Sequence, residues 1–406
     1  MSMVIKERIK GFICVTAHPG GCHKNVLSQI ETIERSAKVP TQFKKAVIIG
    51  GTTGYGLSSR IAATFGAGCG TLNISLERPP RTGRTASAGW YNTVAFEQIA
   101  RNKGYFARTL NADAFSQATK ERACEIVRSE FGDIDLLIYS VAAPKRVDET
   151  TGISYQSVLK PIGEQLTSKT VNVATRAISD VTIAAASEAE ITATVKVMGG
   201  EDWAAWVETF LAAGLLNKNF KTLAYSYIGS PITAAIYRKG TIGRAKDDLE
   251  QTAMQLNEKL AASKITGAAS ISVNKALVTQ ASSAIPILPL YVSILYKVMK
   301  EHNLHEDTTA QIKRLFSQIS RLEQEKTTHS KSHSQWPPLF RLDDFELNPS
   351  VQAEVSRRWN AVNEANLSDM ADLTGYWNDF LGLFGFGRKD IDYDLEVEEN
   401  LPLDLF

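Results

Sequence analysis

The chain has 406 residues, 44% of them hydrophobic, and a formal net charge of +1 at pH 7. This length can bury a large core, and the balanced charge gives no basic field that favours nucleic acid as a partner. Charges near the N-terminus argue against a signal peptide, and the longest apolar run, residues 281–296, is short for a membrane span and contains two prolines. The four cysteines form no C-x-x-C pair, so we expect reduced thiols in the cytoplasm, no metal site and no stable membrane insertion.

The predicted elements alternate between strands and helices. An apolar run at 44–51 enters glycines, and Leu57, Ile61 and Phe65 follow at helical spacing. Apolar strands separated by helices predict an α/β fold with a parallel sheet covered by helices. The remaining predictions are strands at 71–77 and 133–143, a helix at 121–132, a strand at 193–198, a helix at 201–216, a strand at 221–229, a helix at 245–262 and a strand with its exit at 267–279.

Two regions do not follow this alternation. Residues 1–43 precede the first strand of the sheet, and residues 300–406 follow the last one. Within the second region, the polar stretch at 323–338 is predicted to be an exposed linker. The acidic stretch at 390–400 is predicted to be a solvated surface segment.

A glycine loop follows the first strand of the sheet. Gly50, Gly54 and Gly56 give the pattern G-x-x-x-G-x-G between a strand and a helix. The missing Cβ atoms let the backbone approach a pyrophosphate, and the helix after the loop presents free N–H groups to it. A tight turn into a packed helix also favours glycines, but the order of strand, loop, helix and strand favours a dinucleotide site.

An acidic residue lies where such a site places one. Glu77 ends the next strand about twenty residues beyond the loop, the position at which an acid binds the adenosine ribose hydroxyls. The alternative is an ordinary acid at a strand end. A carboxylate there repels a 2′-phosphate and predicts NADH over NADPH, although Arg78, Arg81 and Arg84 follow closely and arginine accommodates that phosphate.

Two further loops are expected to meet the cofactor. Asp113 and Ala114 follow a strand, near the adenine, and Val141 and Ala142 lie at the carboxyl end of the next strand. Asp113 is also a plausible helix N-cap residue, a role that is compatible with the first.

A tyrosine and a lysine supply candidate catalytic groups. Tyr237 and Lys246 are nine positions apart, which on one unbroken helix would place them on roughly opposite faces. Gly240 and Gly243 suggest that the helix is interrupted, so both side chains can face one side. A tyrosine hydroxyl can donate to a developing oxyanion, and a nearby ammonium is expected to lower its pKa. The alternative is a core tyrosine and a solvated lysine.

The chain resembles the trans-2-enoyl thioester reductases, which comprise the FabV-type enoyl-acyl-carrier-protein reductases and trans-2-enoyl-CoA reductases. The resemblance covers almost the whole chain and includes GFICVTAHPGGC, GGTTGYG, YSYIGSPITAAIYRKGTIGRAK, SVNKALVTQASSAIPILPLY, FRLDDFEL and LTGYWNDFLGLFGFG. It implies one enlarged domain with a Rossmann-type doubly wound parallel sheet. The implied organisation is an N-terminal extension at 1–43 packed on the core, an NADH-binding and catalytic domain at 44–300, and a C-terminal extension at 301–406 with an acidic tail.

The resemblance also implies roles for residues. Tyr237 would be the proton donor, Lys246 would bind the cofactor and Tyr227 would contact the substrate thioester. No flavin is predicted, because 334–347 shows no dinucleotide fingerprint. The residues implied at NADH are Gly50, Gly51, Thr52, Thr53, Gly54, Tyr55, Leu76, Glu77, Asp113, Ala114, Val141, Ala142, Lys246, Leu277, Val278 and Thr279.

The predicted function is NADH-dependent reduction of the C2=C3 double bond of trans-2-enoyl thioesters, carried by acyl-carrier protein or coenzyme A, in fatty acid biosynthesis. Residues 283–296 would cover the acyl chain with apolar side chains. We expect a monomer. Two alternatives stay open: a ketoreductase of the same fold, and a non-catalytic NADH-binding redox sensor, which would not require Tyr237 and Lys246 together.

Overall fold

The computed structural model describes residues 2–11, 13–36, 41–328 and 336–403. Its centre is a sheet of seven strands in which every neighbouring pair is parallel. In spatial order, the strands are β14 (Leu339–Arg341), β13 (Ala268–Val273), β12 (Leu216–Ser226), β7 (Ile134–Tyr139), β4 (Lys45–Ile49), β5 (Gly70–Ser75) and β6 (Ala107–Asn111).

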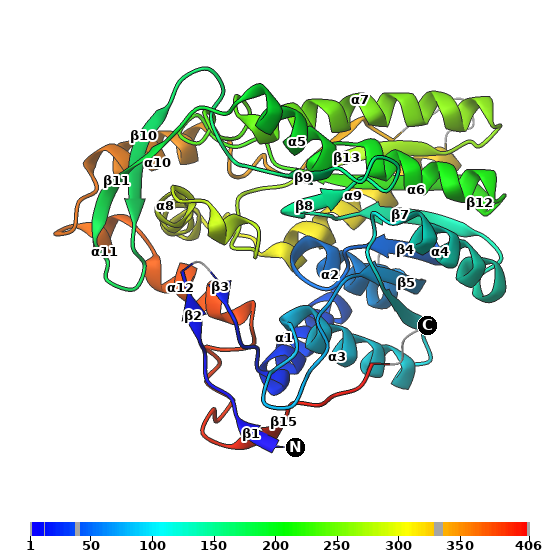
Figure 1. Ribbon diagram of the computed structural model, residues 1–406, viewed down its shortest axis with the longest axis horizontal. Helices are drawn as coiled ribbons and strands as arrows, with labels where there is room; N and C mark the ends of the chain where they lie inside the picture. Colours follow the sequence, from blue (N-terminus) through cyan, green and yellow to red (C-terminus); the bar gives the residue numbers. More distant parts are fainter. Residues whose placement is uncertain (1, 12, 37–40, 329–335, 404–406) are drawn as a thin grey trace.

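Helices cover both faces of this sheet (Figure 1). Alternate strand residues serve the two faces, so Ile48 packs into one core while Val47 and Ile49 pack into the other. The helices of the first face are α1 (Pro19–Glu34), α2 (Gly54–Ile61), which continues as a π-helical turn (Ala62–Gly66), α3 (Ala88–Asn102) and α9 (Thr308–Thr328); those of the second are α4 (Gln117–Glu130), α6 (Glu201–Ala212) and α7 (Thr241–Ala262).

The order of the strands reverses between β4 and β7. The chain first winds outward through β4, β5 and β6, then crosses back to β7 and winds outward through β12 and β13. This is the doubly wound Rossmann-type arrangement, in which ligands bind beyond the carboxyl ends of the strands at the reversal point. The predicted fold class is confirmed.

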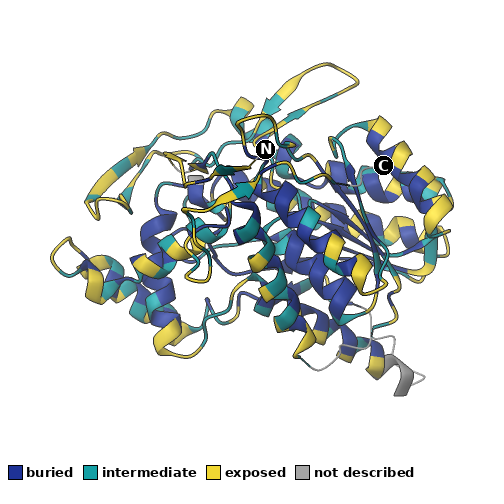
Figure 2. Ribbon diagram, turned by 90° about the horizontal axis from the view of Figure 1, so that it is seen from below, coloured by how far each residue is buried: buried dark blue, intermediate teal, exposed yellow. Residues whose placement is uncertain are grey.

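A third core lies beside the sheet and is built around α8 (Leu288–Glu301), whose residues from Leu290 to Tyr296 are almost completely buried. Figure 2 shows the buried residues of this third core next to the sheet. The elements that pack there or nearby are a short 3-10 helix (Ser282–Ala284), α10 (Pro349–Ala361), α11 (Leu367–Met370), α12 (Leu373–Gly382), and the hairpins β2 (Ile9–Lys10) with β3 (Ile13–Cys14), β8 (Lys145–Val147) with β9 (Ser154–Gln156), and β10 (Leu166–Val171) with β11 (Ile178–Ile183).

The predicted strand at 193–198 is wrong. The segment belongs to a helix, α5 (Glu188–Met198), which packs against α7. A capping box starts this helix: Ser187 accepts from the Glu190 N–H, and the Glu190 side chain accepts from the Ser187 N–H. The cap and the contact with α7 outweigh the strand preference of a run that is rich in threonine and valine.

The acidic tail is less exposed than predicted. Within it, β15 (Glu396–Glu398) pairs antiparallel with β1 (Ser2–Val4), so this part of the tail lies beside the N-terminal segment. Glu399 is buried, and its carbonyl accepts from the Tyr91 hydroxyl at 2.8 Å. The predicted linker at 323–338 is also only partly right: α9 continues to Thr328, Trp336 is buried, and 329–335 lie outside the described residues.

Candidate active site

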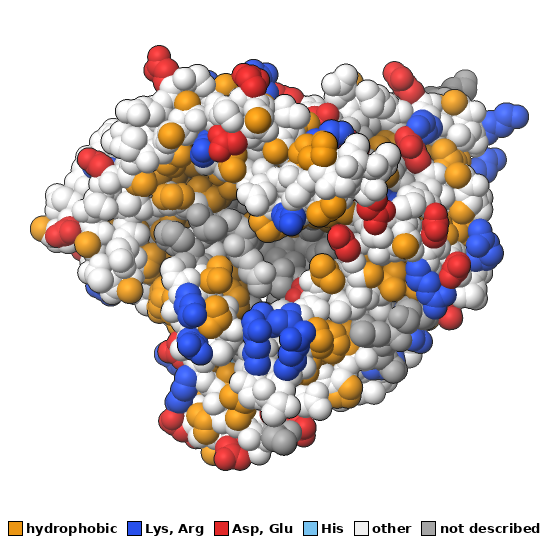
Figure 3. All heavy atoms as spheres, in the orientation of Figure 1, with side chains coloured by type: hydrophobic (Ala, Val, Ile, Leu, Met, Phe, Trp, Pro, Cys, Tyr) orange, Lys and Arg blue, Asp and Glu red, His pale blue; other side chains and the backbone are white. Residues whose placement is uncertain are grey.

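A cavity of about 610 Å³ lies at the carboxyl ends of the sheet strands, at the point where the strand order reverses. On the space-filling view, this side of the molecule is hollowed near its centre (Figure 3). Most of the predicted site residues line the cavity, namely Gly50, Thr52, Thr53, Gly54, Tyr55, Leu76, Glu77, Asp113, Ala114, Val141, Ala142, Tyr227, Tyr237, Lys246, Leu277 and Thr279.

Two predicted residues do not line it. Gly51 is buried against β5, and its N–H donates to Asn73 Oδ1 at 2.8 Å. Val278 is also buried, and its N–H donates to the Tyr296 hydroxyl at 3.3 Å. Both residues support loops of the site from behind.

The glycine loop is shaped for close approach. Gly50 has φ +83°, and a Cβ atom there would lie 2.2 Å from the Ser140 carbonyl oxygen, so only glycine fits between β4 and β7. Gly54 also has a positive φ, but a Cβ there would meet only Thr279 Cγ2, at 3.8 Å. The N-terminus of α2 therefore opens onto the cavity, and its N-cap residue Thr53 makes no capping bond. Free N–H groups beside an open glycine fit a diphosphate.

Glu77 reaches this loop from the end of β5. Its Oε1 accepts from Thr52 Oγ1 at 2.6 Å, and its Oε2 accepts from Ser87 Oγ at 2.5 Å. Burial raises the pKa of Glu77 above its usual value, and the two hydroxyl donors oppose that rise. The carboxylate thus ties the loop to the start of α3, and its remaining lone pairs are available at the cavity wall.

The loop after β6 forms the next part of the wall. Asp113 is exposed, and its Oδ1 accepts from the Phe115 N–H at 3.0 Å; the N-cap of α4 is Ser116, so the capping role considered for Asp113 is wrong. The Ala114 carbonyl is held from inside by Lys120 Nζ at 3.0 Å and by Trp206 Nε1 at 3.1 Å. These two buried side chains fix the course of the loop.

The segment between Tyr237 and Lys246 is interrupted, as predicted. Residues 231–239 form turns, and α7 begins at Thr241 after Gly240. A Cβ at Gly243 would lie 2.3 Å from the Arg238 carbonyl oxygen, so the turns and α7 pack too closely for a side chain there. Both Tyr237 and Lys246 line the cavity.

The electrostatics of the pair differ from the prediction. Burial, together with the negative charge of Glu346, raises the pKa of Tyr237 above its usual value, whereas a lowering by the lysine was expected. Lys246 Nζ donates to the Tyr225 carbonyl at 3.0 Å, and burial lowers its pKa to about 8. Tyr237 is therefore a protonated donor at neutral pH. Lys246 is charged at neutral pH and loses its charge as the pH rises through about 8.

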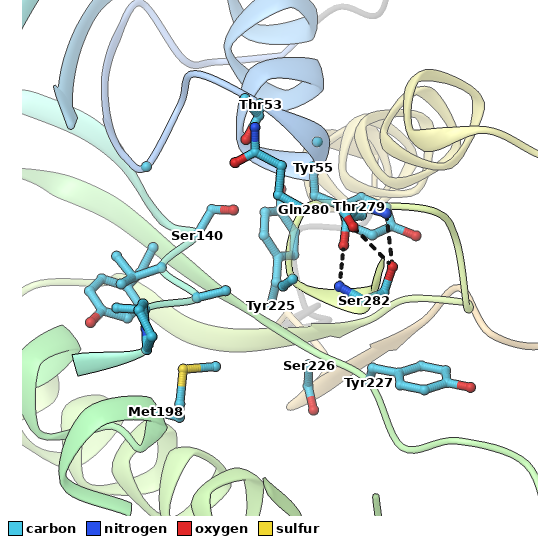
Figure 4. Close-up of a pocket in the computed structure, with 18 of the residues that line it drawn as sticks. Thr53, Tyr55, Ser140, Met198, Tyr225, Ser226, Tyr227, Thr279, Gln280 and Ser282 are labelled. Carbon is cyan, nitrogen blue, oxygen red and sulfur yellow. Dashed lines mark hydrogen bonds between the residues drawn. The ribbon is translucent and has the colours of Figure 1, made fainter. Parts of the chain in front are cut away.

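The tyrosines at the end of β12 point in different directions (Figure 4). The strand ends at Ser226, so the alternation of side chains along a strand does not extend to Tyr227. The Tyr225 hydroxyl lies 2.5 Å from Ser59 Oγ on the α2 side. The Tyr227 hydroxyl donates to Glu346 at 3.0 Å, and its ring meets the Tyr237 ring edge-on with centroids 4.5 Å apart.

The loop at 277–282 closes the cavity opposite α2. Ser282 Oγ accepts from the Thr279 N–H at 2.8 Å and donates to the Leu277 carbonyl at 2.7 Å, while the Ser282 N–H donates to Thr279 Oγ1 at 3.1 Å (Figure 4). Sequence reasoning missed several residues that also line this cavity, including Ser140, Met198, Asn274, Lys275, Gln280 and Ser282. Ser140 and Gln280 are adjacent in sequence to predicted residues. Met198 falls where a strand was predicted.

A smaller cavity, of about 380 Å³, adjoins the main one and shares Gln280 with it. Arg78 and Arg84 line it, together with residues of β3 and the start of α3. Lys and Arg side chains gather along one rim of the hollowed face in Figure 3. This side of the site favours anionic groups.

All four cysteines are free and buried. Within the described parts of the chain, no three His, Cys, Asp or Glu side chains cluster in a way that could hold a metal ion. Among the helices described, none is both long and apolar enough to cross a membrane.

The fold and the site together define an oxidoreductase with a dinucleotide-binding cavity. A family model described as the trans-2-enoyl-CoA reductase catalytic region matches residues 84–320, and one described as the NAD(P)H binding domain of trans-2-enoyl-CoA reductase matches 4–82. The chain belongs to the trans-2-enoyl-CoA reductase family. The predicted family and its nicotinamide cofactor are confirmed.

Relatives of full length agree with this assignment. The chain is 46% identical over 402 residues to an enoyl-[acyl-carrier-protein] reductase [NADH] of Cytophaga hutchinsonii, with 99% of each chain covered. It is also 46% identical to a trans-2-enoyl-CoA reductase [NADH] of Ruminiclostridium cellulolyticum, with 98% of this chain and 99% of that one covered. Among solved structures, a Clostridium trans-2-enoyl-CoA reductase in complex with NADH superposes with a TM-score of 0.92 at 41% identity over the full length of both chains.

A third family model, described as an enoyl reductase FAD binding domain, matches residues 338–397. In the structure, this range forms β14, α10, α11, α12 and β15 and packs against α8 and the N-terminus. Of the two cavities described above, the range reaches only the smaller one, through Phe384. Its described residues form no strand, glycine loop and helix in succession, so they do not fit a flavin dinucleotide.

Proposed function

We propose that this protein reduces the C2=C3 double bond of trans-2-enoyl thioesters in fatty acid biosynthesis, with NADH as the reductant. The main support is one cavity that is lined by the open glycine loop, a protonated tyrosine and a buried lysine. Bound NADH would supply the hydride, which adds to C3 of the substrate. We further propose that the enzyme is a cytoplasmic monomer with an N-terminal extension at 1–43, a catalytic domain at 44–300 and a C-terminal extension at 301–406.

The residues of the chain then have distinct tasks. Residues 50–55 and Glu77 hold the diphosphate and adenosine ribose, and Lys246 holds the nicotinamide ribose. As the hydride adds to C3, the electrons of the double bond shift towards the thioester oxygen, and the Tyr237 hydroxyl stabilises the charge that develops there. A proton then adds at C2, and Tyr237 is the proposed donor. Tyr227 contacts the thioester beside it.

The apolar end of the cavity suits the acyl chain. Met198, Ile285 and Leu288 line it, the last two from the predicted stretch at 283–296. The rest of that stretch, along α8, is buried in the third core, so only its beginning can cover a substrate. The acyl thioester arrives on acyl-carrier protein or coenzyme A, and both carriers are anionic. Arg81 and Arg84, both exposed, lie on the loop that follows Glu77 and are suited to meet such a carrier.

Oxidation of NADH, followed by its absorbance, tests the function. Crotonyl-CoA is expected to be reduced with a kcat/KM that far exceeds that for acetoacetyl-CoA, because the proposed reaction adds hydride to carbon 3 of an enoyl group. Crotonyl-acyl-carrier protein in the same assay compares the carriers. Faster turnover of acetoacetyl-CoA would instead identify a ketoreductase, and NADH binding without turnover of either thioester would identify a redox sensor.

The cofactor preference is expected to depend on Glu77. We predict a higher kcat/KM with NADH than with NADPH. We expect Glu77→Ala to lower the ratio of these two kcat/KM values by about tenfold, or ~1.4 kcal/mol, because it removes repulsion of the 2′-phosphate. The measurement is kcat/KM with both cofactors. Asp113→Ala, which removes an exposed acid from the neighbouring loop, is the matched control and should leave the ratio nearly unchanged. Equal kcat/KM values in the unmodified protein would contradict the role of Glu77.

A further inference from the structure

A buried glutamate of the C-terminal extension lies behind the tyrosines of the site. Glu346 follows β14 and has no exposed surface. Its Oε1 accepts from the Tyr227 hydroxyl at 3.0 Å and from the Tyr291 hydroxyl at 2.7 Å, and its Oε2 accepts from the Ala276 N–H at 2.6 Å. Burial raises the pKa of Glu346, but all three partners are donors that oppose this rise, which suits an ionised carboxylate that can only accept.

This arrangement decides where the Tyr227 proton points. A phenol has one O–H proton, and Tyr227 donates that proton to Glu346. The Tyr227 oxygen therefore offers only lone pairs to the cavity. The Tyr237 hydroxyl, by contrast, makes no hydrogen bond to any residue in the described part of the chain, so its proton is available to a ligand.

On the basis of the proposed function, we propose that Glu346 is a positioning residue for enoyl reduction: it withholds the Tyr227 proton from the thioester and leaves Tyr237 as the hydroxyl donor to the reacting oxygen. Tyr227 and Tyr237 meet edge-on with ring centroids 4.5 Å apart and line the same cavity, so both lie close to a thioester bound beside them. Without the carboxylate, either hydroxyl could donate. Glu346 thus acts through Tyr227 and assigns the two tyrosines different tasks.

The substitution Glu346→Gln should invert the hydrogen bonds. The Ala276 N–H requires an acceptor, so it would orient the new side-chain amide with its oxygen towards Ala276 and its nitrogen towards the tyrosines. The two amide protons would then be donated to Tyr227 and Tyr291, which frees the proton of each hydroxyl. The side chain keeps its size, so the packing around it is preserved.

The decisive experiment is a double-mutant cycle of Glu346→Gln and Tyr237→Phe, with kcat measured on crotonyl-CoA. We expect the loss of kcat caused by Tyr237→Phe to be at least tenfold smaller in the Glu346→Gln background, because the freed Tyr227 proton replaces the lost donor. Adding Tyr227→Phe should abolish this rescue. The matched control is Tyr291→Phe, which removes the other hydroxyl on the same carboxylate oxygen and should leave the cost of Tyr237→Phe unchanged. Equal costs in both backgrounds would overturn the proposal.

Two further measurements keep the test decisive. Melting temperature and NADH affinity, from quenching of protein fluorescence, show whether Glu346→Gln is folded. If it is not, Tyr227→Phe alone decides: it should raise KM for crotonyl-CoA and change kcat less than threefold, since its proton is not donated to substrate. A kcat loss as large as that of Tyr237→Phe would refute the inference. An unmodified protein that does not reduce crotonyl-CoA would refute the proposed function instead.

Discussion

Tyr237→Phe is expected to lower kcat for crotonyl-CoA by roughly 10²–10³-fold while NADH affinity is retained, as is typical when one oxyanion donor is removed. Burial and the charge of Glu346 keep this hydroxyl protonated, and no described residue accepts its proton. It can therefore donate at the moment when charge develops on the thioester oxygen. Steady-state kinetics and NADH titration separate the two effects, because loss of an interaction made only in the transition state lowers kcat and not cofactor binding.

The neighbouring tyrosines provide graded controls. Tyr227→Phe should act mainly on KM, since this ring lies beside Tyr237 but its proton is held by Glu346. Tyr225→Phe should do least: its hydroxyl is paired with Ser59, and the group that holds Lys246 is its backbone carbonyl, which the substitution keeps. A wild-type kcat in Tyr237→Phe, or a greater loss in Tyr225→Phe than in the other two, would contradict the assignment.

The cofactor side of the site could be predicted because its signals are local in sequence. A strand, a glycine loop and a helix occupy consecutive positions, and Gly50 is needed both for its positive φ and for its contact with Ser140. The acid at the end of the next strand follows at a fixed distance. Each of these constraints acts within one β-α-β unit, so the local pattern of glycines and apolar residues is enough to predict them.

The rest of the site depends on contacts that local patterns do not contain. Met198 reaches the cavity from α5, whose last six residues were predicted as a strand. The prediction missed the helix because the cap at Ser187 determines where it starts and the contact with α7 stabilises it. Glu346 comes from a segment about 120 residues away from Tyr227, and its role is visible only once the tyrosine hydroxyl is found on its carboxylate. Tyr225 and Tyr227 reach different partners, Ser59 and Glu346, because β12 ends between them.

Lys246→Met is expected to lose most of its activity, on the order of a hundredfold in kcat/KM, while the protein stays folded. The ammonium is anchored by the Tyr225 carbonyl at the cavity wall, where it would hold the cofactor beside Tyr237. Methionine keeps the length of the side chain but removes the charge and the donors. NADH affinity and kcat are therefore both expected to fall, and the two are separated by titration and by saturating kinetics.

Lys246→Met is expected to lower activity but not stability. Burial lowers the pKa of Lys246 to about 8, below its ordinary value in an unfolded chain. Between pH 8 and the ordinary lysine pKa, the unfolded state binds more protons, so the stability of the unmodified protein rises with pH there, and the cost of the buried ammonium is fully present below about pH 8. Lys246→Met removes that cost, so its melting temperature at pH 7 should equal or exceed that of the unmodified protein.

The same pKa predicts how activity depends on pH. If the charged form of Lys246 supports turnover, kcat/KM should fall as pH rises through about 8, and the residual activity of Lys246→Met should lack this step. Lys239→Met, an exposed lysine in the turns just before α7, is the matched control and should keep both the activity and the pH step. A folded Lys246→Met protein with near-normal turnover would show that this lysine is an ordinary helix residue, because the loss of its charge would then have changed nothing that the reaction uses.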